Sequence, residues 1–140
     1  MNTLLLVNFA CASYLSGLIL TVQLVHYPSF IYINSKTFNK FHKFHIKKIS
    51  IAVMMPMIIE LASSIALVYL SPTIVNIILL IMISSIWLST IALSVPRHNE
   101  LSNGKSPRLI SELVLTNWPR AILWPTRSII LFITLTKSIL

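Results

Sequence analysis

The chain has 140 residues, of which 56% are hydrophobic and 10% are charged, and its formal net charge is +8. A soluble domain usually carries about 25% charged residues, so the composition argues against a soluble fold and the length allows one domain. The positive charge lies between long apolar runs, which is typical of membrane proteins and argues against a nucleic-acid partner.

The first apolar run covers residues 3–25, and an apolar helix of about 20 residues crosses a bilayer. The start of the run lacks positive charge, and the run is longer than the apolar part of an ordinary signal peptide. We therefore expect a retained membrane helix. Gln23 and His26 lie one turn apart at its end.

The segment TFNKFHKFHIKK, residues 37–48, separates the first run from the second. At about 100° per residue its lysines share one stripe, while Phe38, Phe41, His42 and His45 share the opposite side. The segment is therefore predicted to be a short amphipathic helix at the membrane surface. Both imidazoles would be on its buried face, where polar groups need partners.

The second and third apolar runs, residues 49–70 and 73–95, are predicted to form an antiparallel hairpin around Ser71-Pro72. Glu60 would lie about 15 Å from the nearer interface, at a rise of about 1.5 Å per residue. A charge at that depth costs at least about 2.5 kcal/mol. Glu60 is thus expected to be protonated and hydrogen-bonded, or paired with Arg127, and a packing role remains open.

The third run and the residues directly after it carry polar residues along one helical face, at positions i, i+3, i+7 and i+11 (Trp87, Thr90, Ser94 and His98). After it, Ser106-Pro107 is typical of a helix start. Apolar residues recur at helical spacing from Leu109 to Val114, which predicts a second short amphipathic helix on the membrane.

A fourth run at residues 121–139 is predicted to span last, opened by Asn117, Trp118 and Arg120, with Arg127 inside it. All four histidines of the chain would then converge at one end of an all-α, four-helix integral membrane bundle. We expect His26, His42, His45, His98 and Arg120 to be the catalytic candidates. The substrate-binding candidates are Gln23, Trp87, Thr90, Asn117, Trp118, Glu60 and Arg127.

Basic residues define the expected orientation. Nine of the 11 lysines and arginines fall in the two long links or at their boundary (Lys36, Lys40, Lys43, Lys47, Lys48, Arg97, Lys105, Arg108 and Arg120). The positive-inside rule then places both links in the cytoplasm and both termini outside, as in a bacterial inner-membrane protein.

The sequence supports no defined cofactor. His42 and His45 are three residues apart and could share a metal, but this spacing is common by chance. The chain has no HExxH motif, cysteine cluster or phosphate loop. Whether a metal or a cofactor binds stays open at this point.

The order of features resembles the small four-helix membrane proteins that include anthrone-oxygenase-like enzymes. The resemblance rests on TVQLVHYPSF, on the stretch from Thr90 to VPRHNEL, and on NWPRAILWPTR. Family members show Pro-x-Asn-x-x-Leu, where this chain has Pro96, His98 and Leu101. The resemblance implies the four-helix fold and, in some relatives, oxidation of polycyclic phenols by oxygen without a cofactor.

Three function classes follow. The first is an accessory or structural membrane subunit, because nothing in the sequence requires chemistry. The second is a small membrane enzyme, redox or oxygenase-like, whose histidines and Arg120 act on a lipophilic substrate that enters from the bilayer. The third is a haem or metal binder. The expected partners are the lipid bilayer, a lipophilic small molecule, and further copies or a membrane complex.

Overall fold

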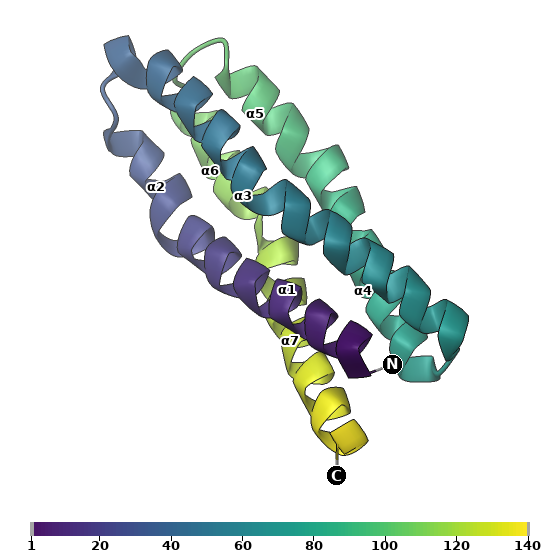
Figure 1. Cartoon of the computed structure of the whole chain (residues 1–140). Coiled ribbons are helices and arrows are strands. Elements are labelled where there is room, and N and C mark those ends of the chain that lie inside the picture. Colours follow the sequence, from purple (N-terminus) through teal and green to yellow (C-terminus); the bar gives the residue numbers. More distant parts are fainter. Residues whose placement is uncertain (1, 140) are drawn as a thin grey trace.

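The computed structural model describes residues 2–139, and within that range the chain is all-helical. Figure 1 shows an elongated helical bundle. The two chain termini and the turn between α3 and α4 lie toward one end, called here the hairpin end. The links from α2 to α3 and from α5 to α6 lie at the opposite end, called here the histidine end.

The first helical rod runs further than residues 3–25. It consists of α1 (Asn2–Thr21), a π-helical turn η1 (Val22–His26), α2 (Tyr27–Ser29) and a 3₁₀ turn η2 (Phe30–Tyr32). Its backbone is helical until Ile33, which is extended. His26 therefore lies within the rod, and Tyr27 follows it on the next turn.

The histidine- and lysine-rich segment is helical, as predicted, but it is not a separate short helix. It forms the first third of α3, a continuous helix of 36 residues from Ser35 to Leu70. Asn34 caps its start, since its side chain accepts a hydrogen bond of 2.9 Å from the Lys36 amide. No breaker separates the segment from the apolar run, so one helix carries both.

The predicted hairpin is present. The chain turns at residues 71–73 and enters α4 (Ile74–Ser89), which Thr73 caps by accepting from the Asn76 amide at 3.2 Å. The Asn76 side chain donates back to the Ser71 carbonyl at 2.8 Å, which fixes the turn. A second π-helical turn, η3 (Thr90–Ser94), then leads into α5 (Val95–Leu101).

The second predicted amphipathic helix is α6 (Pro107–Thr116), and Ser106 caps it as expected. Its apolar face is buried through Ile110 and Leu113. The helix ends at Asn117, and α7 (Trp118–Ile139) begins immediately afterwards. Figure 1 shows α7 crossing behind α1 toward the hairpin end.

Among the described residues, three helical rods are long and apolar enough to cross a membrane: Asn2–Tyr32, Ser35–Leu70 and Ile74–Leu101. Their length and composition associate the chain with a membrane. The α7 helix, predicted as the fourth span, is not among these three. It carries Arg120, Arg127 and Lys137, which lower its mean hydropathy.

Candidate functional site

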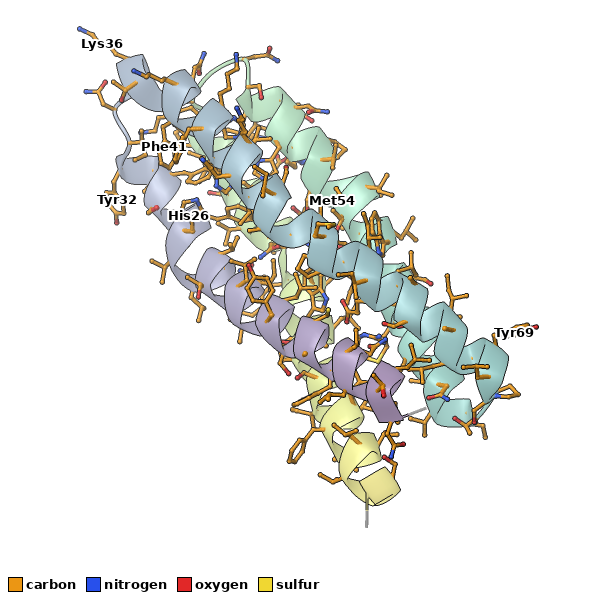
Figure 2. The ribbon with its side chains drawn as sticks, in the orientation of Figure 1. His26, Tyr32, Lys36, Phe41, Met54 and Tyr69 are labelled. Atoms are coloured by element: carbon orange, nitrogen blue, oxygen red, sulfur yellow. The ribbon has the colours of Figure 1, made fainter. Side chains whose placement is uncertain are left out.

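The four histidines meet at the histidine end, as the sequence predicts. His26 Nε2 lies 2.7 Å from His45 Nδ1, and His42 Nε2 lies 3.1 Å from His98 Nδ1. The two pairs are adjacent, because the ring centroids of His45 and His98 are 5.5 Å apart. Three helical rods contribute to the cluster, and Figure 2 shows His26 beside α3 while Lys36 points outward.

Tyr27 joins this cluster, although sequence reasoning did not select it. Its hydroxyl lies 3.0 Å from His98 Nε2, and the residue is only 3% exposed. Both ring nitrogens of His98 therefore have partners, His42 on one side and Tyr27 on the other. Its position directly after His26 was the sequence feature that could have indicated a place in the cluster.

Phenylalanines enclose the histidines. Phe30 and Phe38 are fully buried. Phe38 stacks on His42 with ring centroids 5.6 Å apart, and Phe30 meets His45 edge-on at 5.2 Å. Phe30 from the first rod and Phe38 from the start of α3 thus form an aromatic lining for the imidazoles, whereas Phe44 of the FHKFH stretch is 62% exposed.

A cavity of about 190 Å³ lies beside the cluster. Its walls are mainly apolar residues of α1 and α3, including Met57, and Trp124 of α7 also lines it. Tyr27, His98 and Arg120 supply polar groups to the same cavity. A mostly apolar cavity with a few polar groups is typical of a small-molecule site.

Both π-helical turns border this cavity. Val22 of η1 lines it directly and Tyr27 follows the turn, while Thr90 and Ser94 of η3 line it and His98 follows. Single π-helical turns within longer helices are rare and occur frequently at functional sites. Trp87, Thr90, Ser94 and His98, which were expected on one helical face, all line this cavity.

Three cavity-lining residues carry a buried polar atom without a hydrogen-bond partner within residues 2–139. These atoms are Trp87 Nε1, Ser94 Oγ and Arg120 Nε. Buried polar atoms in native proteins nearly always have partners. The cavity therefore offers unused hydrogen-bonding capacity beside Tyr27 and His98.

Gln23 and Asn117 do not line the cavity. Asn117 accepts from Arg120 Nη2 at 2.5 Å and donates to Gln23 Oε1 at 2.7 Å. Gln23 in turn donates to the Val114 carbonyl at 3.2 Å. The two amides therefore hold the Arg120 side chain in position rather than contacting a ligand.

Trp118 also lies away from the cavity and is 44% exposed. Trp124, two turns further along α7, is 1% exposed and lines the cavity instead. Near the start of α7 the helical rotation decides which tryptophan faces inward, and composition alone does not distinguish the two.

Glu60 and Arg127 form the second polar site, nearer the hairpin end. Arg127 Nε lies 2.6 Å from Glu60 Oε1, and neither side chain is exposed. Of the two states expected from the sequence, the pairing of Glu60 with Arg127 is the one found. Trp124 Nε1 donates to the other carboxylate oxygen at 3.0 Å, so this residue contacts both the cavity and the ion pair.

Sequence reasoning missed the remaining members of this network. Arg127 Nη2 donates to Asn8 Oδ1 at 2.5 Å and to Ser64 Oγ at 2.6 Å, and Nη1 donates to the Leu79 carbonyl. Asn8 also donates to Ser63 Oγ at 2.8 Å. An isolated asparagine within an apolar run was the signal for this site. The network joins α1, α3, α4 and α7.

A third charged group lies on the surface of α5 and α6. Glu112 is 2.9 Å from both Arg97 Nε and Arg108 Nε. The hydrogen bond from Arg108, with smaller contributions from the charges of Arg108 and Arg97, lowers the pKa of the Glu112 carboxyl. This network fastens α6 to α5 but lies outside the cavity.

Within the described residues, no group of three or more His, Cys, Asp or Glu side chains is placed to hold a metal ion. The histidines are close together, but several of their nitrogens face one another in hydrogen bonds. The arrangement is that of a hydrogen-bonded imidazole cluster beside an apolar cavity.

Fold and site together define an all-α helical bundle of membrane type, with a polar cluster at one end and a buried ion pair nearer the other. Comparison of the chain with protein-family models, with curated proteins and with solved structures finds no match. Evidence for a function therefore comes from the chain's own residues.

Proposed function

We propose that this chain is a multi-pass membrane protein that binds a lipophilic small molecule in the cavity and exchanges protons with it. The ligand class is a molecule with an apolar ring system and a hydroxyl or carbonyl group, such as a phenol. This function corresponds to the small membrane enzyme expected above as an alternative to an accessory subunit.

The main support for this proposal is that the cavity combines apolar walls with buried polar atoms that have no hydrogen-bond partner in the described chain. Ser94 and Arg120 are 2% and 5% exposed, and each contributes a buried atom without a partner in the described chain. Leaving such a group unpaired costs about 1–3 kcal/mol. A bound hydroxyl or carbonyl group would satisfy these atoms while its ring fills the apolar part.

The cavity walls also support entry from the bilayer. Met54 and Val95 both line the cavity and are each 46% exposed on the outer surface. In a bilayer these apolar surfaces would face lipid, so a lipophilic molecule would reach the cavity between α3 and α5 without crossing water.

The polar groups suit acid–base chemistry. Tyr27 and His98 are hydrogen-bonded to each other at 3.0 Å, which is the geometry for passing a proton to or from a ligand oxygen. Arg120, held by Asn117, would stabilise a negative charge that develops on that oxygen. The resemblance to anthrone-oxygenase-like proteins agrees with a phenolic ligand.

The proposed setting is a bacterial inner membrane, with α7 as the fourth span. Both long links would be cytoplasmic and both termini outside. Support comes from the five exposed lysines of α3, which lie at the histidine end together with Arg97, Lys105 and Arg108. Lipid headgroups of the cytoplasmic leaflet attract such basic clusters.

The test measures binding of 1-naphthol to the purified protein in lipid nanodiscs. The quenching of tryptophan fluorescence reports the binding. We expect saturable quenching, because Trp87 and Trp124 line the cavity. Ser94→Leu should abolish it by filling the cavity, whereas Ser94→Ala should weaken binding by only about two- to tenfold, since it removes one hydrogen bond to the ligand and leaves the cavity open. Trp118→Phe is the control for an exposed tryptophan and should leave the titration unchanged.

Two results would contradict the proposed function. One is quenching that rises linearly with naphthol and never saturates, as simple partitioning into lipid does. The other is saturable binding with equal affinity in Ser94→Leu. Either result would leave the accessory-subunit function, which the fully partnered Glu60–Arg127 network favours because it connects four helices without a ligand.

A further inference from the structure

We infer that His42, His98 and Tyr27 form a proton relay that connects the outer surface of the histidine end with the cavity. This inference rests on the proposed function, because the relay delivers protons to a ligand in the cavity. It adds a route and an entry point, and it assigns a role to His42, which does not line the cavity.

The outer end of the relay is a surface depression between α3 and the end of α5. Its lining consists of Asn39, His42, Lys43, Ile46, Lys47 and Ser102. Lys43 and Lys47 are exposed, so the depression is open to water. His42 itself is 1% exposed and forms the inner wall between this depression and the cluster.

The connection from that wall to the cavity has two hydrogen bonds. His42 Nε2 lies 3.1 Å from His98 Nδ1, and His98 Nε2 lies 3.0 Å from the Tyr27 hydroxyl. His98 and Tyr27 both line the cavity. Consecutive hydrogen bonds thus connect His42, which lines the outer depression, to His98 and Tyr27, which line the cavity.

Each member can accept a proton on one atom and release another proton from a second atom. A proton from water would bind His42 Nδ1, and the Nε2 proton would move to His98 Nδ1. The His98 Nε2 proton would then move to the Tyr27 oxygen, and the Tyr27 hydroxyl proton would move to the ligand oxygen. One proton enters, one leaves, and both imidazoles exchange their tautomers.

The surroundings favour this path over a water-filled one. Phe38 stacks on the His42 ring, and Phe30 meets the same ring edge-on with centroids 6.1 Å apart. Both phenylalanines are fully buried, so they exclude water from the space between the outer depression and the cavity.

The second histidine pair provides a matched control. His26 bonds to His45 at 2.7 Å, but neither makes a hydrogen bond to His42, His98 or Tyr27. His45 Nε2 is buried without a partner in the part of the chain described. Removing His26 perturbs the same cluster and leaves the relay intact.

The test uses a nitronaphthol bound to the protein in nanodiscs, since its ionised form is coloured. A stopped-flow pH jump would measure how fast the bound molecule gains or loses its proton. We expect His42→Phe and His98→Phe to slow this rate by about tenfold or more, and His26→Phe to leave it within about twofold. Equilibrium affinity should remain unchanged in His42→Phe, because His42 does not line the cavity.

Chemical rescue separates a relay from a packing role. In His42→Ala, imidazole added to the buffer should restore the rate in proportion to its concentration, because the outer depression is open. Saturable nitronaphthol binding with a wild-type rate in His42→Phe would overturn the relay while the proposed function stands. Failure of the wild-type protein to bind nitronaphthol would overturn both.

A second measurement covers the case in which the variants do not fold. Nuclear magnetic resonance on the wild-type protein with ¹⁵N-labelled histidine should show a scalar coupling across the hydrogen bond from His42 Nε2 to His98 Nδ1. Absence of that coupling, with the His26–His45 coupling present, would overturn the relay.

Discussion

Arg127 on α7 and Glu60 on α3 form an ion pair of 2.6 Å in which both side chains have no solvent exposure. Burial of two charges in an apolar bundle is unfavourable unless the remaining hydrogen-bonding capacity is used. Here Trp124, Asn8 and Ser64 use it. The pair therefore specifies how α3, α7 and α1 fit together.

The first prediction concerns this pair. Glu60→Gln should destabilise the bundle by about 3–5 kcal/mol, because it leaves an uncompensated guanidinium inside the protein. Glu60→Gln combined with Arg127→Met should recover much of that loss. Unfolding in detergent, followed by circular dichroism, measures both effects. Additive losses in the double variant would show that the two residues are not coupled.

The second prediction compares the two faces of the first part of α3. His45→Ala should lower stability by about 1–3 kcal/mol, since it removes the hydrogen bond to His26 and leaves that imidazole without its partner. Lys43→Gln on the exposed face should change only surface attraction to anionic lipid, by about 1 kcal/mol at most. Denaturation in detergent and binding to anionic vesicles separate the two effects. Equal loss of stability in both variants would contradict the inward placement of His45.

The third prediction is a pH dependence from Glu112. Its pKa is lowered in the folded protein by the hydrogen bond from Arg108, so the folded state favours the ionised carboxyl. The resulting stability is fully present above the ordinary glutamate pKa and is lost as pH falls through the lowered pKa. Melting temperatures measured down to the acid range should fall more steeply in wild type than in Glu112→Gln. Parallel curves would rule out this contribution.

The fourth prediction concerns orientation. In a Cys11→Ser background, Asn103→Cys should react with a membrane-impermeant maleimide only after the inner face is opened. Tyr69→Cys is the matched control, since Tyr69 is 87% exposed at the hairpin end and should react in intact cells. Reaction of Asn103→Cys in intact spheroplasts would reverse the proposed orientation.

Much of this arrangement could be predicted from periodicity and charge. Long apolar runs predict helices because backbone groups must be paired within lipid. The lysine stripe predicts which face of α3 carries His42 and His45. The depth of Glu60 predicts a partner, and Arg127 was the one cation within reach in the sequence.

The remainder depends on how helices rotate and pair, which one sequence does not encode locally. The π-helical turns η1 and η3 shift the residues beyond them around the helix axis, so the inward face of Tyr27 could not be read from regular spacing. In the sequence Asn8 is an isolated polar residue, and only the packing of α1 beside α3 and α7 gives it hydrogen-bond partners. The first third of α3 was expected to be a separate helix because its composition differs from that of the apolar run, but a change in composition does not break a helix.

The unbroken length of α3 means that one helix can extend from the lipid into the water. Its 36 residues extend about 54 Å, whereas a bilayer core is about 30 Å thick. In a crossing along the bilayer normal, about 24 Å of the helix would lie beyond the hydrocarbon, and the lysine-bearing turns are the part that tolerates water. His42 and His45 lie on those turns, while Met54 and Met57, which line the cavity, lie deeper along the same helix. Lipophilic molecules would thus reach the cavity from the lipid, and protons would reach His42 from the water. Only two hydrogen bonds, from His42 to His98 and from His98 to Tyr27, separate these two points.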